Sequence, residues 1–277
     1  MPPPDRSETV PAALFADRGW QVPAFQVRLH APRRARYALV IPVINEGDRI
    51  RAQLRELHRA GASADVIIAD GGSDDGSLAD DFIETVAVRA VLTKLGPGKL
   101  SAQLRMAYAW CLEEGYDGIV TMDGNGKDGV EGISSFLRKL DEGYDYVQGS
   151  RYGRGGSARN TPLDRTLGNR LVHAPLLSIA GRYWYSDTTN GFRAYSSRYL
   201  KDIRVAPFRD VFANYELLFY LTVRAGQLGY RISEVPVRRG YPPPGSTIPT
   251  KIGDWSAKFS ILRQTLCTAC GAYRPPR

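Results

Sequence analysis

The chain of 277 residues has few cysteines, few histidines and no long apolar run. Three cysteines cannot build a disulfide framework, and the three histidines show no spacing that would complete a zinc site with Cys267 and Cys270. The most apolar stretch, 171–180, contains a histidine and a proline and is shorter than the ~18 residues that span a bilayer. The N-terminus has acids and prolines where a signal peptide needs an uninterrupted apolar segment. We therefore expect a soluble, cytoplasmic protein.

The composition is that of a globular chain with a basic second half. Hydrophobic residues make up 43% of the chain and charged residues 24%, which excludes wholesale disorder. Residues 141–277 contain 20 basic and 10 acidic residues, against 17 and 19 in residues 1–140. The excess of positive charge favours a partner that bears phosphate. A nucleotide, a phospholipid and a nucleic acid all meet that description.

Short apolar runs alternate with helical spacings from residue 37 onward. Strands are predicted at 37–43, 65–69, 86–92, 118–122, 144–148 and 230–237, and helices at 46–60, through 82, at 99–114, 130–140, 165–180, 214–225 and 255–268. This alternation predicts an α/β fold with a mostly parallel sheet and helices on both faces. We expect a loosely structured N-terminal arm at 1–36, one domain at 37–250, and an amphipathic helix with a tail at 251–277.

Polar clusters follow four of the predicted strands, at the strand ends where open α/β sheets bind ligands. They are residues 45–46, 70–77, 123–128 and 149–151. Glycines in the second cluster let the backbone approach a ligand, and Asp70 offers acceptors for a base N–H or a ribose hydroxyl. Asp123 and Asn125 supply oxygen ligands that suit Mg²⁺ or Mn²⁺ bridging phosphates. The alternative is ordinary turn chemistry, which uses the same residue types.

These residues resemble family 2 glycosyltransferases of the GT-A fold, especially the polyprenyl-phosphate branch that includes dolichol-phosphate mannose synthases. The motifs lie in the family's order: VIPVINE at 40–46, ADGGSDDGS at 69–77, the DxD-like MDGNGKD at 122–128, GSR at 149–151, DTTNGFRAYS at 187–196, EVPV at 234–237 and PTKI at 249–252. Single motifs are weak, but a collinear series is specific. Neither GxGxxG nor GxxxxGK[ST] occurs, so neither a dinucleotide fold nor a P-loop is supported.

The resemblance implies an inverting glycosyltransferase that moves a sugar from a nucleoside-diphosphate sugar to a polyprenyl phosphate or a soluble hydroxyl acceptor. By position, the nucleotide would contact Pro42, Asn45, Glu46, Asp70, Lys99 and Asp123, the metal would contact Asp123 and Asn125, and the leaving-group or acceptor phosphates would contact Lys127, Arg151, Arg193 and Arg239. Arginine is suited to this because its guanidinium binds phosphate bidentately.

A hydroxyl acceptor would require a general base, whereas a lipid phosphate is already anionic. Glu216 and Asp187 are the two candidates for that base. The alternative for Glu216 is a first-turn acid that interacts with the helix dipole, and for Asp187 an Asx-type turn cap.

Two motifs depart from the family pattern. Gly71 stands where many members have a second Asp in the nucleotide loop. In the DxD-like motif, Asn125 replaces the second Asp and Lys127 stands where Gln is common. Loss of a carboxylate and gain of an ammonium predict a weakened dependence on the divalent metal, with Lys127 partly substituting for the ion.

Other functions fit the sequence less well. A nucleotidyltransferase would show a Gly-rich basic loop after the first strand, where this chain has Ile44, Asn45 and Glu46. A non-enzymatic phosphate-binding or nucleic-acid-binding module would explain the basic half, but no RRM, KH or helix-turn-helix signature occurs, so we expect no nucleic-acid partner.

The C-terminal helix raises a separate question about partners. Trp255 and Phe259, with Lys258 and Arg263, suit a helix that lies at the inner face of a membrane. The alternative is packing against the protein's own core or against a second subunit in a homodimer.

Overall fold

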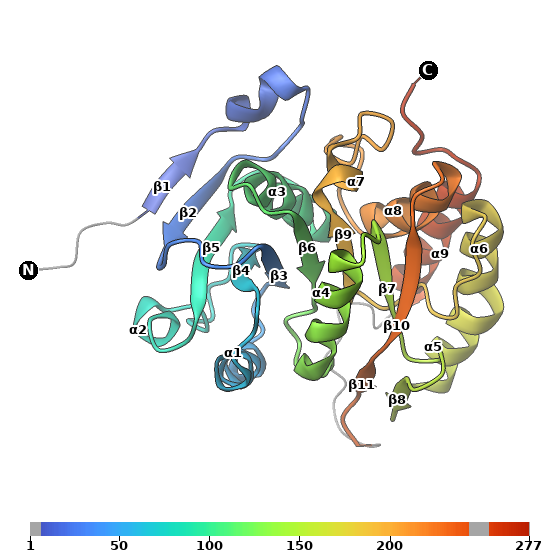
Figure 1. Ribbon diagram of the computed structural model, residues 1–277, viewed down its shortest axis with the longest axis horizontal. Coiled ribbons are helices and arrows are strands. Elements are labelled where there is room, and N and C mark those ends of the chain that lie inside the picture. The colour runs from blue at the N-terminus through green and yellow to red at the C-terminus, as the bar shows by residue number, and fades with distance from the viewer. Residues whose placement is uncertain (1–6, 244–254, 277) are drawn as a thin grey trace, which may run out of the picture. The chain divides into compact units, whose positions relative to one another are not determined.

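The computed structural model describes residues 7–243 and 255–276 (Figure 1). The chain divides into two compact units. The first unit comprises residues 1–126 and 208–214, and the second comprises residues 127–207 and 215–277. The PTKI motif at 249–252 lies outside the described residues. Since the chain passes between the units at residues 126, 207 and 214, no single linker marks the division in the sequence.

Within the described residues, the first unit contains six strands. They are β1 (Ser7–Val10), β2 (Phe25–Leu29), β3 (Tyr37–Val43), β4 (Asp65–Asp70), β5 (Val88–Lys94) and β6 (Gly118–Thr121), in the spatial order β1-β2-β5-β4-β3-β6. Strands β5, β4, β3 and β6 pair in parallel, whereas β1 and β2 add antiparallel at one edge. The predicted α/β class with a mostly parallel sheet is confirmed.

Residues 7–29 are not the loose arm that the sequence predicted. Strand β2 pairs with β5 in a register that aligns Phe25 with Lys94. The short helix η1 (Ala12–Arg18) buries Phe15, whose ring stacks against those of Trp20 and Phe25. The prolines and arginines of this segment hid the alternation of buried and exposed residues in β2.

Three helices complete the first unit: α1 (Asp48–Ala60), α2 (Asp80–Ile83) and α3 (Leu100–Glu113). Helix α1 buries Ile50, Leu54 and Leu57, the stripe that the sequence predicted. Helix α3 is buried from Ser101 to Leu112 and packs against β3, β4 and β5. Its polar side chains are therefore enclosed and must find partners inside the unit.

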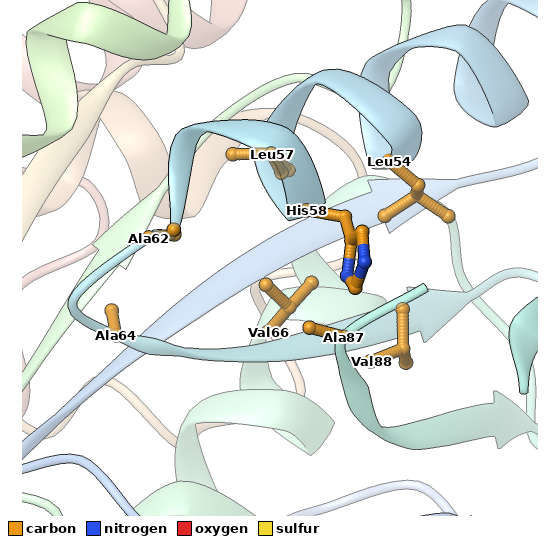
Figure 2. Close-up of a pocket in the computed structure, with 9 residues that line it drawn as sticks. Leu54, Leu57, His58, Ala62, Ala64, Val66, Ala87 and Val88 are labelled. Carbon is orange, nitrogen blue, oxygen red and sulfur yellow. The ribbon is translucent and has the colours of Figure 1, made fainter. Parts of the chain in front are cut away.

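A small apolar pocket lies between α1 and the first residues of β4 and β5 (Figure 2). Leu57 and His58 of α1 line it together with Val66 and Val88 of the strands. Because β4 runs from Asp65 to Asp70, the pocket lies at the opposite end of the strand from the polar clusters. It is not the site that the motifs predict.

In the described residues, the strands of the second unit form two hydrogen-bonded groups. Their strands are β7 (Tyr146–Ser150), β8 (Ser157–Arg159), β9 (Arg193–Ser196), β10 (Ile232–Pro236) and β11 (Arg238–Gly240), in the orders β9-β7-β10 and β11-β8. Strand β10 is parallel to β7, and β9 is antiparallel to it. The sequence predicted β7 and β10 and missed the other three, which are only three or four residues long.

The helices of this unit lie where the sequence predicted them, except for the five-residue α7, which was missed. They are η2 (Val130–Gly132), α4 (Ile133–Asp141), α5 (Leu163–Leu167), η3 (Gly168–His173), α6 (Ala174–Gly181), α7 (Ser197–Lys201), α8 (Glu216–Gln227) and α9 (Trp255–Ala269). Segments α5, η3 and α6 run on without a break, and η3 is π-helical. Across the described ranges, no helix has the length and apolar character that crossing a membrane requires.

Candidate active site

Three polar turns leave the parallel sheet of the first unit at the same edge. Strands β4 and β6 flank β3 and run parallel to it, with Val43 aligned to Asp70 and Val40 to Thr121. The residues that follow these strands therefore emerge side by side, at the edge where open α/β sheets bind ligands. Residues 45–46, 70–77 and 123–126, which belong to three of the four predicted clusters, lie at or after the ends of these strands.

Asp70 anchors the glycine-rich turn after β4. Its side chain is buried, and its carboxylate accepts hydrogen bonds from Ser73 N at 2.9 Å, Ser73 Oγ at 2.7 Å and Thr93 Oγ1 at 3.1 Å. A Cβ atom at Gly71 would lie 2.9 Å from Gln103 Nε2. Gln103 in turn donates to the carbonyls of Val43 and Ala69, so the glycine at 71 allows this side chain to tie β3 to β4.

The turn after β3 is bound to the turn after β4 by reciprocal hydrogen bonds. Asn45 donates its main-chain N–H to Ser73 Oγ at 3.1 Å, and its Oδ1 accepts from Asp74 N at 3.0 Å. Gly47 N donates to Asp75 Oδ2 at 2.8 Å. Burial raises the pKa of Asp75, but the hydrogen bonds from Ser77 and Gly47 outweigh this effect and lower it. The loop is held in shape by its own polar groups.

Two lysines belong to the same unit. Lys94 ends β5, and its pKa is lowered by burial, an effect that the Asp70 carboxylate opposes. The motifs did not single out Lys94, although a lysine just beyond the end of a predicted buried strand is itself a signal of a candidate binding residue. Lys99 is exposed at the start of α3, where its main-chain N–H donates to Ala213 O at 2.7 Å.

The DxD-like turn follows β6. Asn125 Nδ2 lies 3.5 Å from Asp123 Oδ2, and both side chains are half-buried. Gln53 of α1 stabilises the turn, since it donates to Asp123 O at 3.0 Å and accepts from Gly126 N at 3.0 Å. Sequence reasoning missed Gln53 and Gln103, although each is a buried polar residue within a helix that faces the core.

Gly124 is required where it stands, because a Cβ atom there would lie 2.9 Å from Pro42 O and 3.0 Å from Val43 Cγ2. We expect Gly124→Ala to lower the free energy of unfolding by about 1–3 kcal/mol, the usual cost of overpacking. Urea unfolding measures this, with Gly168→Ala as the control, since no atom lies within 4 Å of a Cβ built at Gly168. Equal stability of both variants would contradict the close contact of this turn with β3.

A divalent cation fits the DxD-like turn only in part. Asp123 offers a carboxylate and Asn125 an amide oxygen, both of which suit Mg²⁺ or Mn²⁺. No group of three or more His, Cys, Asp and Glu side chains that could hold a metal occurs in the described part of the chain. A cation here would therefore take further oxygens from a bound ligand, as Mg²⁺ does when it bridges substrate phosphates.

In the second unit, basic side chains gather around Tyr241. The Lys127 ammonium lies 4.8 Å from the centre of its ring, and Arg165 Nη1 donates to its hydroxyl at 3.3 Å. Arg239 lies 6.0 Å from the same ring and forms an ion pair with buried Asp128. Burial raises the pKa of Tyr241, but Arg239, Arg165 and Arg151 outweigh this and lower it.

Arg151 and Asp187 form a buried ion pair. The carboxylate accepts from Arg151 Nε at 2.7 Å, Nη2 at 2.9 Å and main-chain N at 3.1 Å, and the Asp187 side chain is 0% exposed. Arg151 also donates to Thr189 Oγ1 at 2.7 Å. Burial alone would lower the pKa of Arg151, but Asp187 raises it. Asp187 therefore holds Arg151 in place, and this pairing disfavours the predicted role of Asp187 as a general base.

Comparison with known proteins agrees with this geometry. Residues 38–204 match the family described as Glycosyl transferase family 2. A polyprenol monophosphomannose synthase from Mycolicibacterium smegmatis is 30% identical over 205 residues, which cover 73% of this chain and 76% of that protein. An undecaprenyl-phosphate mannosyltransferase from Micrococcus luteus is 30% identical over 209 residues, which cover 73% of this chain and 82% of that protein.

The chain belongs to glycosyl transferase family 2. It is a glycosyltransferase, and the predicted resemblance to the polyprenyl-phosphate branch is confirmed. The nucleotidyltransferase and binding-module alternatives are not favoured.

Solved structures confirm the GT-A fold of this family 2 glycosyltransferase. Glucosyl-3-phosphoglycerate synthase from Mycobacterium tuberculosis in complex with UDP aligns with a TM-score of 0.59 at 18% identity, over 87% of this chain and 81% of that chain. The same enzyme in complex with Mn²⁺, UDP and glucosyl-3-phosphoglycerate aligns with a TM-score of 0.58 at 17% identity, over 89% of this chain and 87% of that chain.

Two residues predicted for this glycosyltransferase have other surroundings. Arg193 is 1% exposed and donates to the carbonyls of Asn190, Thr188 and Leu218. The prediction that Arg193 contacts phosphate is corrected, because its guanidinium donates to these main-chain carbonyls and to Thr222 Oγ1. Glu216 is the first residue of α8 and is buried. Burial of the Tyr273 phenol is the main cause that raises its pKa to about 12, and the Glu216 carboxylate adds to this effect.

Proposed function

We propose that this glycosyltransferase moves a sugar from a nucleoside-diphosphate sugar to a polyprenyl phosphate, with inversion at the anomeric carbon. The basic side chains around Tyr241 carry the proposal: Arg165 donates to the phenol hydroxyl, and Arg239 and Arg151, which are paired with Asp128 and Asp187, lie near it. The two relatives that are 30% identical support the choice of acceptor, because both are named as enzymes of polyprenyl-phosphate mannose chemistry. Their names also make mannose the first donor sugar to test.

On the donor side, we propose that the three turns of the first unit bind the nucleotide. Asp70 would accept from the base or the ribose, and the turns at Asn45, Glu46 and Pro42 would frame it. Asp123 and Asn125 would hold Mg²⁺ or Mn²⁺ against the diphosphate, where such an ion neutralises the charge that develops as the leaving group departs. Lys99, exposed at the start of α3, would face the same phosphates.

The acceptor decides whether a general base is needed. An oxygen of the lipid phosphate forms the new bond to the anomeric carbon while the bond to the donor diphosphate breaks, and the nucleoside diphosphate leaves. Because a phosphate monoester is already ionised at neutral pH, no side chain has to remove a proton. The engagement of the Asp187 carboxylate by Arg151 fits this mechanism better than the hydroxyl-acceptor alternative.

Transfer assays test the proposed function directly. The full-length protein is incubated with UDP-, GDP- and CDP-sugars, and the release of nucleoside diphosphate is measured with and without polyprenyl phosphate. We expect release that depends on the lipid phosphate. Release that depends instead on a soluble hydroxyl acceptor would assign the alternative function. The same assay with and without EDTA, in the wild type and in Lys127→Ala, measures how far Lys127 replaces the metal.

The titration of Tyr241 measures the potential at the proposed phosphate site. We expect the phenol to ionise below its ordinary pKa of 10.0, because the neighbouring cations stabilise the phenolate more than burial disfavours it. Inorganic phosphate should raise this pKa, since a bound anion offsets the positive charge. The difference in ultraviolet absorbance between wild type and Tyr241→Phe isolates this phenol. A pKa at or above 10.0 that ignores phosphate would contradict the proposed site.

A further inference from the structure

Two helical segments of the second unit present large apolar side chains to solvent. On α5 and η3, Leu163 is 71% exposed, Leu167 47% and Leu171 70%. On α9, Trp255 is 84% exposed and Phe259 69%. Single exposed apolar residues are normal, but contiguous ones mark an interaction surface. We call these five residues the apolar face.

The spacing of these residues places them on stripes. Leu163, Leu167 and Leu171 are four residues apart along one uninterrupted helical segment, and Trp255 and Phe259 have the same spacing on α9. The stripe on α9 is not needed for the core, since that helix buries Gln264, Thr265 and Thr268 and packs Ile261 against Leu177, Phe219 and Val223.

An ion pair brings the two stripes together. Lys258 Nζ lies 2.7 Å from Asp164 Oδ2, which joins the first turn of α9 to the first turn of α5. Leu163 precedes Asp164 in the sequence and Phe259 follows Lys258, so an exposed apolar side chain flanks each partner. Further along, His173 Nδ1 lies 2.9 Å from Thr265 Oγ1. The helices that carry the stripes are in direct contact.

The charges on these helices identify the partner. Residues 163–182 and 255–269 contain the bases Arg165, Arg170, Arg182, Lys258 and Arg263 and the single acid Asp164. An apolar helix face with basic residues and a tryptophan is the pattern of helices that lie in the headgroup region of a membrane. A second copy of this chain would bring like charges together across a symmetric interface, which disfavours a homodimer here.

We propose that the apolar face inserts into the surface of a membrane that contains anionic lipid. The leucines and aromatic rings enter the boundary between headgroups and acyl chains, and the exposed Arg170, Arg182 and Arg263 contact lipid phosphates. This inference deepens the proposed function, since a polyprenyl phosphate is held in a membrane. Vesicle binding is measured without donor or acceptor, so failure of the membrane surface and failure of sugar transfer are distinguishable.

Vesicle flotation tests the proposal with the full-length protein. Vesicles of phosphatidylcholine alone are compared with vesicles that also contain phosphatidylglycerol, at low and high salt. We expect binding to be at least about tenfold tighter with the anionic lipid and to weaken with salt. The double variant Leu171→Glu with Phe259→Glu should lose about tenfold or more of that affinity, because two apolar anchors become charged.

The matched control is the double variant Leu14→Glu with Ile203→Glu, which changes charge equally at sites that are 62% and 87% exposed and lie outside the apolar face. It should bind as the wild type does. Absence of wild-type binding to anionic vesicles overturns the proposal, and so does equal loss in both double variants. A wild-type dimer that Leu171→Glu with Phe259→Glu dissociates, seen by sedimentation, would also overturn it in favour of a second copy.

Discussion

Replacing Asp123 by alanine is expected to lower the rate of sugar transfer by about a hundred- to a thousandfold, the usual cost of removing one group that stabilises transition-state charge. Asp123 is the carboxylate of the DxD-like turn, where Asn125 contributes no charge. Without this carboxylate, the turn would lose the negatively charged ligand for a cation, and such a cation would neutralise the charge that develops on the departing diphosphate. Release of nucleoside diphosphate under saturating donor measures the effect.

Asp74→Ala is the control for this substitution. Asp74 lies in the neighbouring turn and is exposed, and its main-chain N–H donates to Asn45 Oδ1. Both variants should keep the thermal stability of the wild type, because the hydrogen bonds from Gln53 to the DxD-like turn go to main-chain atoms and not to the Asp123 carboxylate. A fully active Asp123→Ala protein would remove this turn from the reaction.

Asp187→Asn is expected to lower the free energy of unfolding by about 3–5 kcal/mol, the cost of leaving one member of a buried ion pair without its partner. Arg151 is 5% exposed and Asp187 is 0% exposed, so water cannot replace the lost charge. Asparagine keeps the shape of the side chain, which makes the missing charge the main change. Urea unfolding of the two proteins measures the difference.

Two further variants identify the cause of that loss. Asp117→Asn breaks an exposed pair with Arg36 and should cost less than about 1 kcal/mol. Arg151→Met with Asp187→Leu removes both buried charges and should recover much of the stability, since a buried pair and apolar residues of similar volume are often equivalent. Should Asp187→Asn retain full stability and lose transfer alone, Asp187 would be the general base after all.

The sequence predicted most of the fold because buried parallel strands are continuous apolar runs. Tyr37–Val43 is recognised to the residue, since both faces of β3 are covered and the run ends in a polar turn. Strands β8, β9 and β11 could not be predicted, because each is short and contains arginine, so none of them is a continuous apolar run. Strand β2 was missed because the prolines and arginines around it hide its alternation of buried and exposed residues.

The sequence could predict those site residues that belong to motifs after strands. It could not predict the roles of residues such as Arg193, whose contacts depend on burial in the folded protein. Asp70 and Asp123 could be placed at one edge from chain order alone. Arg193 could not be assigned, because the same arginine serves a phosphate or the main chain depending on what the fold brings near it. Gln53 and Gln103 support the turns without belonging to any motif.

Hydrogen–deuterium exchange with and without a nucleoside-diphosphate sugar tests the central claim most directly. That claim is that the turns after β3, β4 and β6 together bind the donor. The account predicts slower exchange of the amides in residues 43–47, 70–77 and 122–126, because a bound nucleotide restricts these turns and shields their N–H groups. Donor binding that protects other segments and leaves these three ranges unchanged would contradict it.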